Sequence, residues 1–282
     1  MRLVTLRTHG SDSTRDADSL TVAARFTSDT EACVIPGYSD VGALLADPQW
    51  REIAAAADGS AVRFSPADLA PVVPSPGKII CVGLNYAKHI EEMGHERPDV
   101  PTLFIKFADA LVGPYDESVV PSFNAGTLDY EGELAVVMGT RARHVARADA
   151  HTHIAGYSIM NDYTQRHYQK RTQQWHQGKS LETTAGFGPW LDTDWTPGPA
   201  LETTLNGERV QHAPTDDLVF DPAALVEFIS HLYPLNPGDV IATGTPDGVG
   251  HARTPQRYLA DGDTVRVAVA GLGYIENTTR VV

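Results

Sequence analysis

The segment GELAVVMG at residues 132–139 constrains the fold more than any other stretch of this sequence. In a β-strand, alternate side chains point to opposite faces. Leu134, Val136 and Met138 therefore share one face, and the apolar residues between them continue the face that begins with Glu133. A strand that is apolar on both faces is typical of a central strand covered on both sides. The charge at its start then needs compensation.

Strand-like segments dominate the rest of the chain and do not alternate regularly with helices. We predict strands within residues 1–7, 78–83, 102–107, 153–162, 202–211, 239–244 and 264–282. We predict helices within residues 40–57, 85–94 and 221–232. Asn206-Gly207 indicates a hairpin turn, and Asp221-Pro222 indicates a helix start. This order favours an α+β fold that is mostly β, with peripheral helices, over a doubly wound fold or a β/α barrel.

A proline-rich segment divides this pattern. PADLAPVVPSPGK, residues 66–78, contains four prolines and is typical of an extended connection. The residues before it form a small unit with a strand and a helix that ends near Asp58-Gly59. We therefore predict a small N-terminal domain at residues 1–72 and a larger main domain at residues 73–282.

The composition excludes several partners. The formal net charge of −14 argues against nucleic acid and against an anionic membrane as partners. An anionic substrate would then need a local cation to bind. The two cysteines, Cys33 and Cys81, fit a reducing cytoplasmic location better than a disulfide framework. No apolar run approaches the length of a membrane span.

Three carboxylates occupy alternate positions at the start of the apolar run: Asp129, Glu131 and Glu133. Glu131 and Glu133 point to one face, where like charges repel and raise each other's pKa. Open solvent, an opposing basic residue or a divalent cation would each relieve this repulsion. Asp162 ends another predicted strand, where it is either a helix N-cap or a third oxygen ligand. An all-oxygen set favours Mg²⁺, Mn²⁺ or Ca²⁺ over Zn²⁺.

Seven segments, taken in order, resemble the fumarylacetoacetate hydrolase family. They are KIICVGLNYAKHIEEMG (78–94), PTLFIKFADALVGP (101–114), LDYEGELAVVMG (128–139), IAGYSIMNDYTQRHYQ (154–169), GKSLETTAGFGPWL (178–191), NPGDVIATGTPDGVG (236–250) and GLGYIEN (271–277). The resemblance extends from about Pro76 to Val282. It implies a β-roll catalytic domain with helices packed outside, a small N-terminal domain before it, and a homodimer.

The resemblance also implies a metal site. In this family the E-x-E pair and the later aspartate hold Mg²⁺ or Mn²⁺, and these positions are Glu131, Glu133 and Asp162 here. Asp129 matches a neighbouring acidic position that is not a direct ligand. An octahedral ion so held keeps positions for the carboxylate and keto oxygens of a 2-oxo acid, and Ca²⁺ can take its place in crystals. The ion would stabilise an enolate.

The family's catalytic group matches three residues. His89 and Glu92 lie three positions apart, so on a helical turn Glu92 can orient the imidazole as a base for water. Lys179 matches a lysine near the reacting oxyanion. Without the resemblance, an incidental surface His–Glu pair and an exposed loop lysine are the simpler interpretations.

Five further residues match positions around the family's substrate. Thr245 matches a threonine near the substrate carboxylate, and Arg166 and Gln169 match polar positions in the pocket. Lys106 matches a family lysine, and Tyr86 is placed at the lid. The structural alternatives are a tight turn for Thr245, an ion pair for Arg166 and a solvent-reaching edge lysine for Lys106.

Two classes of function follow. The first is a metal-dependent enzyme that acts on small anionic 2-oxo or 2,4-dioxo acids in aromatic catabolism. Within this class, the favoured reaction is C–C bond hydrolysis of an acylpyruvate-type substrate, such as fumarylpyruvate or fumarylacetoacetate. The alternative reactions are oxo-acid decarboxylation and isomerisation of a 2-hydroxyhepta-2,4-diene-1,7-dioate-type compound. The second class is a non-catalytic β-rich module that binds Ca²⁺. His89, Glu92 and Lys179 argue against it, because a structural site needs no base.

Overall fold

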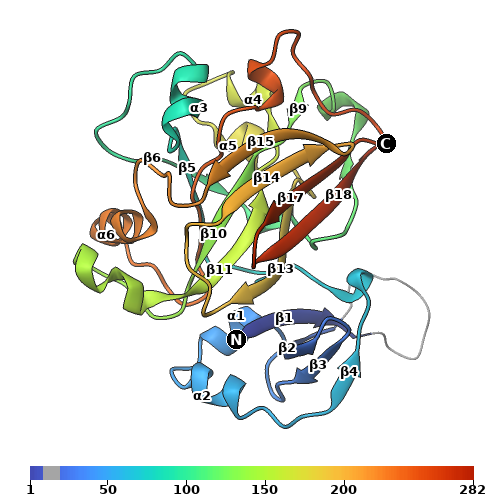
Figure 1. The fold of residues 1–282 in the computed structure, drawn as a ribbon, viewed down its shortest axis with the longest axis vertical. Helices are drawn as coiled ribbons and strands as arrows, with labels where there is room; N and C mark the ends of the chain where they lie inside the picture. Colours follow the sequence, from blue (N-terminus) through green and yellow to red (C-terminus); the bar gives the residue numbers. More distant parts are fainter. Residues whose placement is uncertain (9–19) are drawn as a thin grey trace.

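The computed structural model describes residues 1–8 and 20–282 and contains two packed β-sheets with helices around them (Figure 1). Over the described residues, the large sheet has eleven strands. Its order is β4 (Ala61–Arg63), β3 (Glu31–Val34), β2 (Thr21–Ser28), β1 (Arg2–Arg7), β13 (Ala185–Asp192), β11 (Ile154–Asn161), β10 (Gly132–Met138), β16 (Val240–Ala242), β5 (Ile79–Gly83) and β6 (Thr102–Lys106), with β7 (Leu111–Val112) beside β13.

The other elements cover this sheet or connect its strands. The second sheet has the order β15 (Glu208–Pro214), β14 (Ala200–Leu205), β17 (Thr264–Val269), β18 (Gly273–Val281) and β8 (Ser118–Val120), and β12 (Thr164–Gln165) pairs with β9 (Leu128–Asp129). The α-helices are α1 (Val41–Leu45), α2 (Trp50–Ala55), α3 (Ala87–Glu92), α4 (Arg166–Gln169), α5 (His176–Lys179) and α6 (Pro222–Leu232). Short 3₁₀ turns are η1 (Pro66–Asp68), η2 (Ala108–Ala110), η3 (Ser122–Asn124), η4 (Arg147–His153) and η5 (Gly250–Ala252). The predicted mostly-β fold is confirmed.

Strand β10 lies at the centre of the molecule, as its apolar sequence predicts. It pairs antiparallel with β11 on one side and β16 on the other, and all of its residues are buried. Leu134 lies in the apolar cluster between the two sheets, which also contains Val267. Val136 packs under α6, in the cluster that contains Ile229. Val137 belongs to the cluster on the opposite face, so both faces of the strand are covered.

The helix predicted over residues 40–57 is wrong in its extent, because the structure has two short helices there. Asp40 caps α1 by accepting a hydrogen bond from Ala43 N at 2.8 Å. The chain then turns through Asp47 and Pro48 before α2 begins. Proline has no backbone N–H and disfavours a helical conformation in the residue before it. The apolar pattern continues across this break, which is why it suggested one helix.

Two local predictions in the main body are confirmed. Asn206 and Gly207, both with positive φ (51° and 83°), form the turn between β14 and β15. Helix α6 begins after Asp221, whose carboxylate accepts a hydrogen bond from Ala224 N at 2.8 Å. Its apolar side packs against η4 and the large sheet and includes Leu225 and Ile229.

The N-terminal strands extend the large sheet. Strands β1–β4 with α1 and α2 lie together at the lower end of Figure 1, and β1 pairs antiparallel with β13. Leu3 and Leu44 share an apolar cluster with Phe187. The domain boundary at residues 72/73 stays a prediction. Among residues 1–8 and 20–282, no helix has the length and apolar character to cross a membrane.

The capping of α6 gives a stability prediction. Asp221 also pairs with Arg147 Nη2 at 2.5 Å. Burial opposes ionisation of this carboxyl, but the Ala224 N–H and Arg147 outweigh it and lower its pKa below the ordinary 3.8. We expect Asp221→Ala to reduce the free energy of unfolding by about 1 kcal/mol at neutral pH in urea denaturation. Asp217→Ala, which removes an exposed carboxylate nearby, should change it by less than about 0.5 kcal/mol.

The pH dependence of this difference has a defined sign. A carboxyl whose folded pKa is lowered stabilises the protein above its unfolded pKa, and this contribution disappears as the pH falls through the folded pKa. The difference between wild type and Asp221→Ala should therefore be complete at neutral pH and shrink below about pH 4. A constant difference between pH 7 and about pH 2 would contradict this explanation.

Candidate active site

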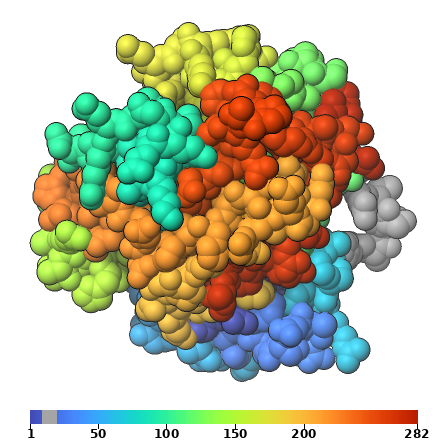
Figure 2. All heavy atoms as spheres, turned by 45° about the horizontal axis from the view of Figure 1, so that its top comes forward, coloured from blue at the N-terminus to red at the C-terminus, as the bar shows by residue number. Residues whose placement is uncertain are grey.

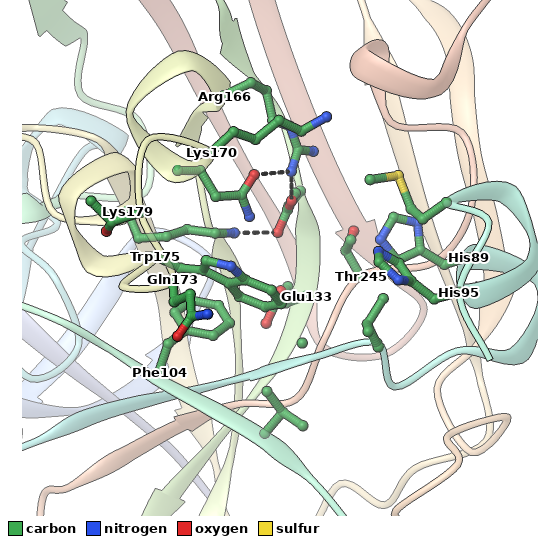
Figure 3. Close-up of a pocket in the computed structure, with 17 residues that line it drawn as sticks. His89, His95, Phe104, Glu133, Arg166, Lys170, Gln173, Trp175, Lys179 and Thr245 are labelled. Carbon is green, nitrogen blue, oxygen red and sulfur yellow. Dashed lines mark hydrogen bonds and ion pairs between the residues drawn. The ribbon is translucent and has the colours of Figure 1, made fainter. Parts of the chain in front are cut away.

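A cavity of about 530 Å³ opens at one end of the molecule. It lies where β5 ends, where β10 begins, and between α3 and the segment that contains α4 and α5. Figure 2 shows residues near α3 in teal, residues near α4 in yellow and residues near 250 in orange-red around the same end. The predicted residues His89, Glu133, Arg166, Lys179 and Thr245 form part of its wall (Figure 3). Glu131 and Gln169 also line it.

Three buried carboxylates converge next to this cavity. One oxygen each from Glu131, Glu133 and Asp162 lies within 4.8 Å of the others. The register of β10 with β11, in which Gly132 pairs with Asn161, places Asp162 beside Glu131. Asp162 N donates to Glu131 O at 2.8 Å. Asp162 is therefore not the cap of the next helix; the side chain of Gln165 caps α4.

Basic side chains surround two of the three carboxylates. Lys179 Nζ lies 2.6 Å from Glu131 Oε2 and 2.7 Å from Asp162 Oδ2. Lys106 Nζ lies 3.0 Å from Asp162 Oδ1. Arg166 Nη1 lies 2.7 Å from Glu131 Oε1. Among the described residues, no ion pair involves Glu133, so its charge is the one that the cations do not balance.

These contacts separate the acidities of the two glutamates. Burial opposes ionisation of Glu131, but Lys179 and Arg166 outweigh burial and lower its pKa to about 2. Burial, Asp162 and Glu131 raise the pKa of Glu133 well above its ordinary value. The expectation that both pKa values rise is therefore correct only for Glu133, because the sequence does not reveal the two cations beside Glu131.

Asp129 holds Arg166 rather than the carboxylate cluster. Its Oδ2 lies 2.9 Å from Arg166 Nε and 2.8 Å from Nη2. Backbone N–H groups of Gly250 and His251 also donate to this carboxylate, at 2.8 and 2.9 Å. Asp129 thus fixes the guanidinium that in turn contacts Glu131. Asp129, which is not one of the predicted metal ligands, therefore positions the guanidinium of Arg166.

The donor set suits a hard divalent cation. Glu131, Glu133 and Asp162 offer only oxygen, which Mg²⁺ and Mn²⁺ prefer. Four buried carboxylates, Asp129 included, face three cations: Lys106, Arg166 and Lys179. The remaining negative charge belongs to Glu133 and needs a further positive charge if it is to stay ionised in the interior. The residues therefore fit the ion that the resemblance implies, while the identity of that ion stays a prediction.

His89 and Glu92 form the predicted pair on α3. His89 Nδ1 lies 3.2 Å from Glu92 Oε2, and the imidazole is buried in the cavity wall. Glu92 is itself held by Gly248 N, which donates to its two oxygens at 3.0 and 3.2 Å. Figure 3 shows His89 across the cavity from Lys179. The pair therefore borders the same space as the carboxylates.

Thr245 has a partner that sequence reasoning missed. Its hydroxyl donates to Gly132 O at 3.0 Å and accepts from Gln211 Nε2 at 2.8 Å. Gln211 Oε1 also accepts from Gly132 N at 3.0 Å, so one buried amide joins β15 of the second sheet to the start of β10. The sequence does not single out Gln211, because its partners Gly132 and Thr245 lie on other segments at no fixed spacing from it. The hydroxyl hydrogen of Thr245 is thus already engaged within the protein.

Two predicted substrate residues lie behind the cavity wall. Lys106 is buried, and its ammonium donates to the carbonyl groups of Tyr163, Lys179 and Thr184 as well as pairing with Asp162. The alternative of a solvent-reaching lysine is wrong. Tyr86 is also buried, and burial raises the pKa of its hydroxyl. Neither side chain forms part of the cavity wall over the described residues.

Glu133→Gln is the cleanest probe of the proposed ion site. The amide oxygen can still accept from Gly244 N, which donates to Glu133 Oε2 at 2.9 Å, and no ion pair in the described part of the chain is broken. We expect Mg²⁺ to raise the stability of wild type by about 2.7 kcal/mol at a hundredfold excess over its Kd. We expect the variant to lose most of this increase in thermal melts with and without MgCl₂ or MnCl₂.

The exposed Glu182→Gln, on the loop after Lys179, serves as the matched control and should keep the full metal response. An unchanged response in Glu133→Gln would show that Glu133 does not bind the ion.

Comparisons with known proteins agree with this arrangement. The family model for the fumarylacetoacetate (FAA) hydrolase C-terminal domain matches residues 78–280. Human oxaloacetate tautomerase FAHD2A, mitochondrial, is 41% identical over 215 residues, which cover 74% of this chain and 68% of that protein.

Two solved structures match along the whole chain. Fumarylacetoacetate hydrolase from the psychrophilic Exiguobacterium antarcticum has a TM-score of 0.84 at 31% identity and covers 100% of both chains. The 2-hydroxyhepta-2,4-diene-1,7-dioate isomerase from Mycobacterium marinum has a TM-score of 0.78 at 32% identity and covers 100% of this chain and 98% of that one. The protein described here therefore belongs to the fumarylacetoacetate hydrolase family of enzymes.

Proposed function

We propose that this protein is a divalent-metal-dependent enzyme that interconverts keto and enol forms of a small 2-oxo acid, as a tautomerase or isomerase. The observation that carries the proposal is the placement of His89 on the wall of the cavity that Glu131, Glu133 and Lys179 also line. A proton-transfer group thus borders the same space as a site for positive charge. The names of two similar proteins, a human oxaloacetate tautomerase and a bacterial dioate isomerase, support this reaction class.

The end of the cavity that contains Glu131, Glu133 and Asp162 would stabilise the negative charge that develops on the keto oxygen of the substrate. A divalent ion held by Glu131, Glu133 and Asp162 would supply a Lewis acid there. Lys179 places a fixed ammonium beside the same carboxylates, where it stabilises negative charge without rearrangement. Lys179 and Arg166 together outweigh burial and lower the pKa of Glu131, which keeps this carboxylate ionised.

Gln169 is suited to hold the substrate carboxylate. Its Oε1 accepts from Arg166 Nη1 at 3.1 Å, which leaves the amide N–H groups to donate toward the cavity that the residue lines. The hydroxyl of Thr245 donates to Gly132 O instead. Direct donation from Thr245 to a substrate would need that bond to break, so in this proposal Thr245 shapes the wall and Gln169 makes the contact.

His89 would move the proton. Conversion of a keto acid to its enol breaks one C–H bond next to the keto carbon and forms one O–H bond. The contact of Nδ1 with Glu92 leaves Nε2 as the ring nitrogen available to a bound molecule. Glu92 also stabilises the imidazolium that forms when His89 accepts the proton. The reaction needs no water, which distinguishes it from hydrolysis.

C–C bond hydrolysis of an acylpyruvate is the second candidate. It is favoured by the same His89–Glu92 pair, which could instead remove a proton from water, and by the similarity to a fumarylacetoacetate hydrolase. Decarboxylation of an oxo acid needs only the charge-stabilising end of the site. Aromatic catabolism and the homodimer stay predictions.

Paired assays separate these candidates. With Mg²⁺ or Mn²⁺, we expect wild type to accelerate tautomerisation of oxaloacetate, followed by enol absorbance, with a higher kcat/KM than hydrolysis of acetylpyruvate or fumarylpyruvate. His89→Gln should reduce kcat at least about 100-fold, because it removes the proton-transfer group. Glu91→Gln removes the adjacent exposed carboxylate and should retain wild-type activity.

Faster hydrolysis than tautomerisation would make the second candidate the function. The absence of metal-dependent acceleration of both reactions would reject the proposed function altogether.

A further inference from the structure

Two cations lie one turn apart on the same side of the cavity. Arg166 and Lys170 are separated by four residues, and Lys170 N donates to Arg166 O at 3.1 Å. Both side chains form part of the cavity wall, and Figure 3 shows them next to each other. Their surroundings differ. Arg166 is buried and contacts Asp129 and Glu131, whereas Lys170 lies at the exposed end of the turn.

Lys170 is held in place without being neutralised. Its ammonium contacts His251 Nε2, and His251 Nδ1 lies 2.7 Å from the hydroxyl of Tyr258. The Gln256 amide donates to His251 O at 2.9 Å and so fixes the backbone of the same residue. In the part of the chain that the structure describes, Lys170 forms no ion pair with a carboxylate. A cation that is positioned by neutral groups in a cavity wall can receive an anion from outside.

The protonation of His251 is consistent with this arrangement. Burial, Lys170 and Arg166 lower the pKa of His251, and Asp129 only partly opposes them. Because an ammonium can only donate, a neutral ring receives its hydrogen at Nε2, while Nδ1 faces the Tyr258 hydroxyl. The Asp129 carboxylate accepts a hydrogen bond from His251 N and also binds Arg166. His251 in turn contacts the Lys170 ammonium, so Asp129 helps to position both cations.

Apart from Arg166, the cavity wall near Lys170 consists of apolar and uncharged polar side chains. Trp175 lies on Gly83, where an added Cβ would meet its ring at 2.5 Å, and it packs at 5.5 Å between ring centroids against Phe104. That wall is apolar. Thr172 and Gln173 complete the wall near Lys170 without adding charge. Among the described residues of the wall, no carboxylate forms an ion pair with Lys170.

We propose that Lys170 is a specificity-determining residue that binds a second carboxylate, at the far end of a substrate whose 2-oxo acid end lies at Glu131, Glu133 and Asp162. This inference rests on the proposed function. Arg166 contacts Glu131 at the inner end of the site, and Lys170 follows one helical turn later in the same cavity wall, so a 2-oxo dicarboxylate could reach both ends. The cation also counters the repulsion that a protein of net charge −14 exerts on a dianion.

Matched ligands test the inference by binding rather than by turnover. 2-Oxobutyrate and 2-oxoglutarate share the 2-oxo acid end and differ chiefly in the second carboxylate. We would measure the Kd of both by isothermal titration calorimetry with saturating Mg²⁺, for wild type, Lys170→Met, Lys170→Gln and Lys170→Arg. The readout is the ratio of the two Kd values, which cancels effects on the inner end of the site.

We expect wild type to prefer 2-oxoglutarate and Lys170→Met to lose about tenfold of this preference, as for one hydrogen bond to a charged group. Lys170→Gln should behave like Lys170→Met, and Lys170→Arg should retain most of the preference. His251→Phe should lose part of it, because the ammonium is no longer held. Arg171→Met, which removes the adjacent cation outside the cavity wall, should keep the wild-type ratio.

The outcomes separate this inference from the proposed function. Metal-dependent binding of 2-oxobutyrate with an unchanged ratio in Lys170→Met and Lys170→Gln would overturn the role of Lys170 and leave the proposed function intact. Failure of wild type to bind either ligand with Mg²⁺ would overturn both. Thermal melts of every variant show whether Lys170 acts through folding: a fall in stability with an unchanged ratio would make it a structural link to His251 only.

Discussion

Buried negative charge at the start of β10 is the constraint on which the rest of the site depends. Four carboxylates are buried there, and each needs a positive or hydrogen-bonding partner. Asp129 has Arg166, Glu131 has Arg166 and Lys179, and Asp162 has Lys106 and Lys179. Glu133 accepts a hydrogen bond from Gly244 N but has no ion pair with a cation in the described part of the chain. The segments that contain these cations come from β6, α4 and α5, so charge balance brings together parts of the chain far apart in sequence.

The sequence predicts most of the fold because its signals are local. The apolar run of β10, the Asn206-Gly207 turn and the Asp221 cap each determine structure within a few residues, and all appear where expected. The prediction over residues 40–57 is wrong in extent because the apolar periodicity continues across Pro48, where the backbone does not. The features of the fold that these local signals do not predict depend on contacts between residues far apart in the sequence.

Some residues of the candidate site are predicted from the sequence and others are not. The three ligands that the resemblance implies do converge, because the pairing of β10 with β11 brings Asp162 beside Glu131. Gln211 and the role of Asp129 could not be predicted, since each acts across a sheet or a loop with no fixed spacing in the chain. The ranking of hydrolysis ahead of isomerisation is also beyond the sequence, because both reactions use the same base and the same charge-stabilising end. Similarity to a tautomerase and an isomerase reverses that order in the proposed function.

Residues 248–251 mechanically couple the two sides of the cavity. Gly248 N binds the glutamate that orients His89, while Gly250 N and His251 N bind the aspartate that orients Arg166. Backbone donors within one short segment thus hold both Glu92, the partner of His89, and Asp129, the partner of the guanidinium next to the carboxylate cluster. A displacement of this segment would disturb both contacts at once, so the positions of His89 and Arg166 are linked through one stretch of backbone.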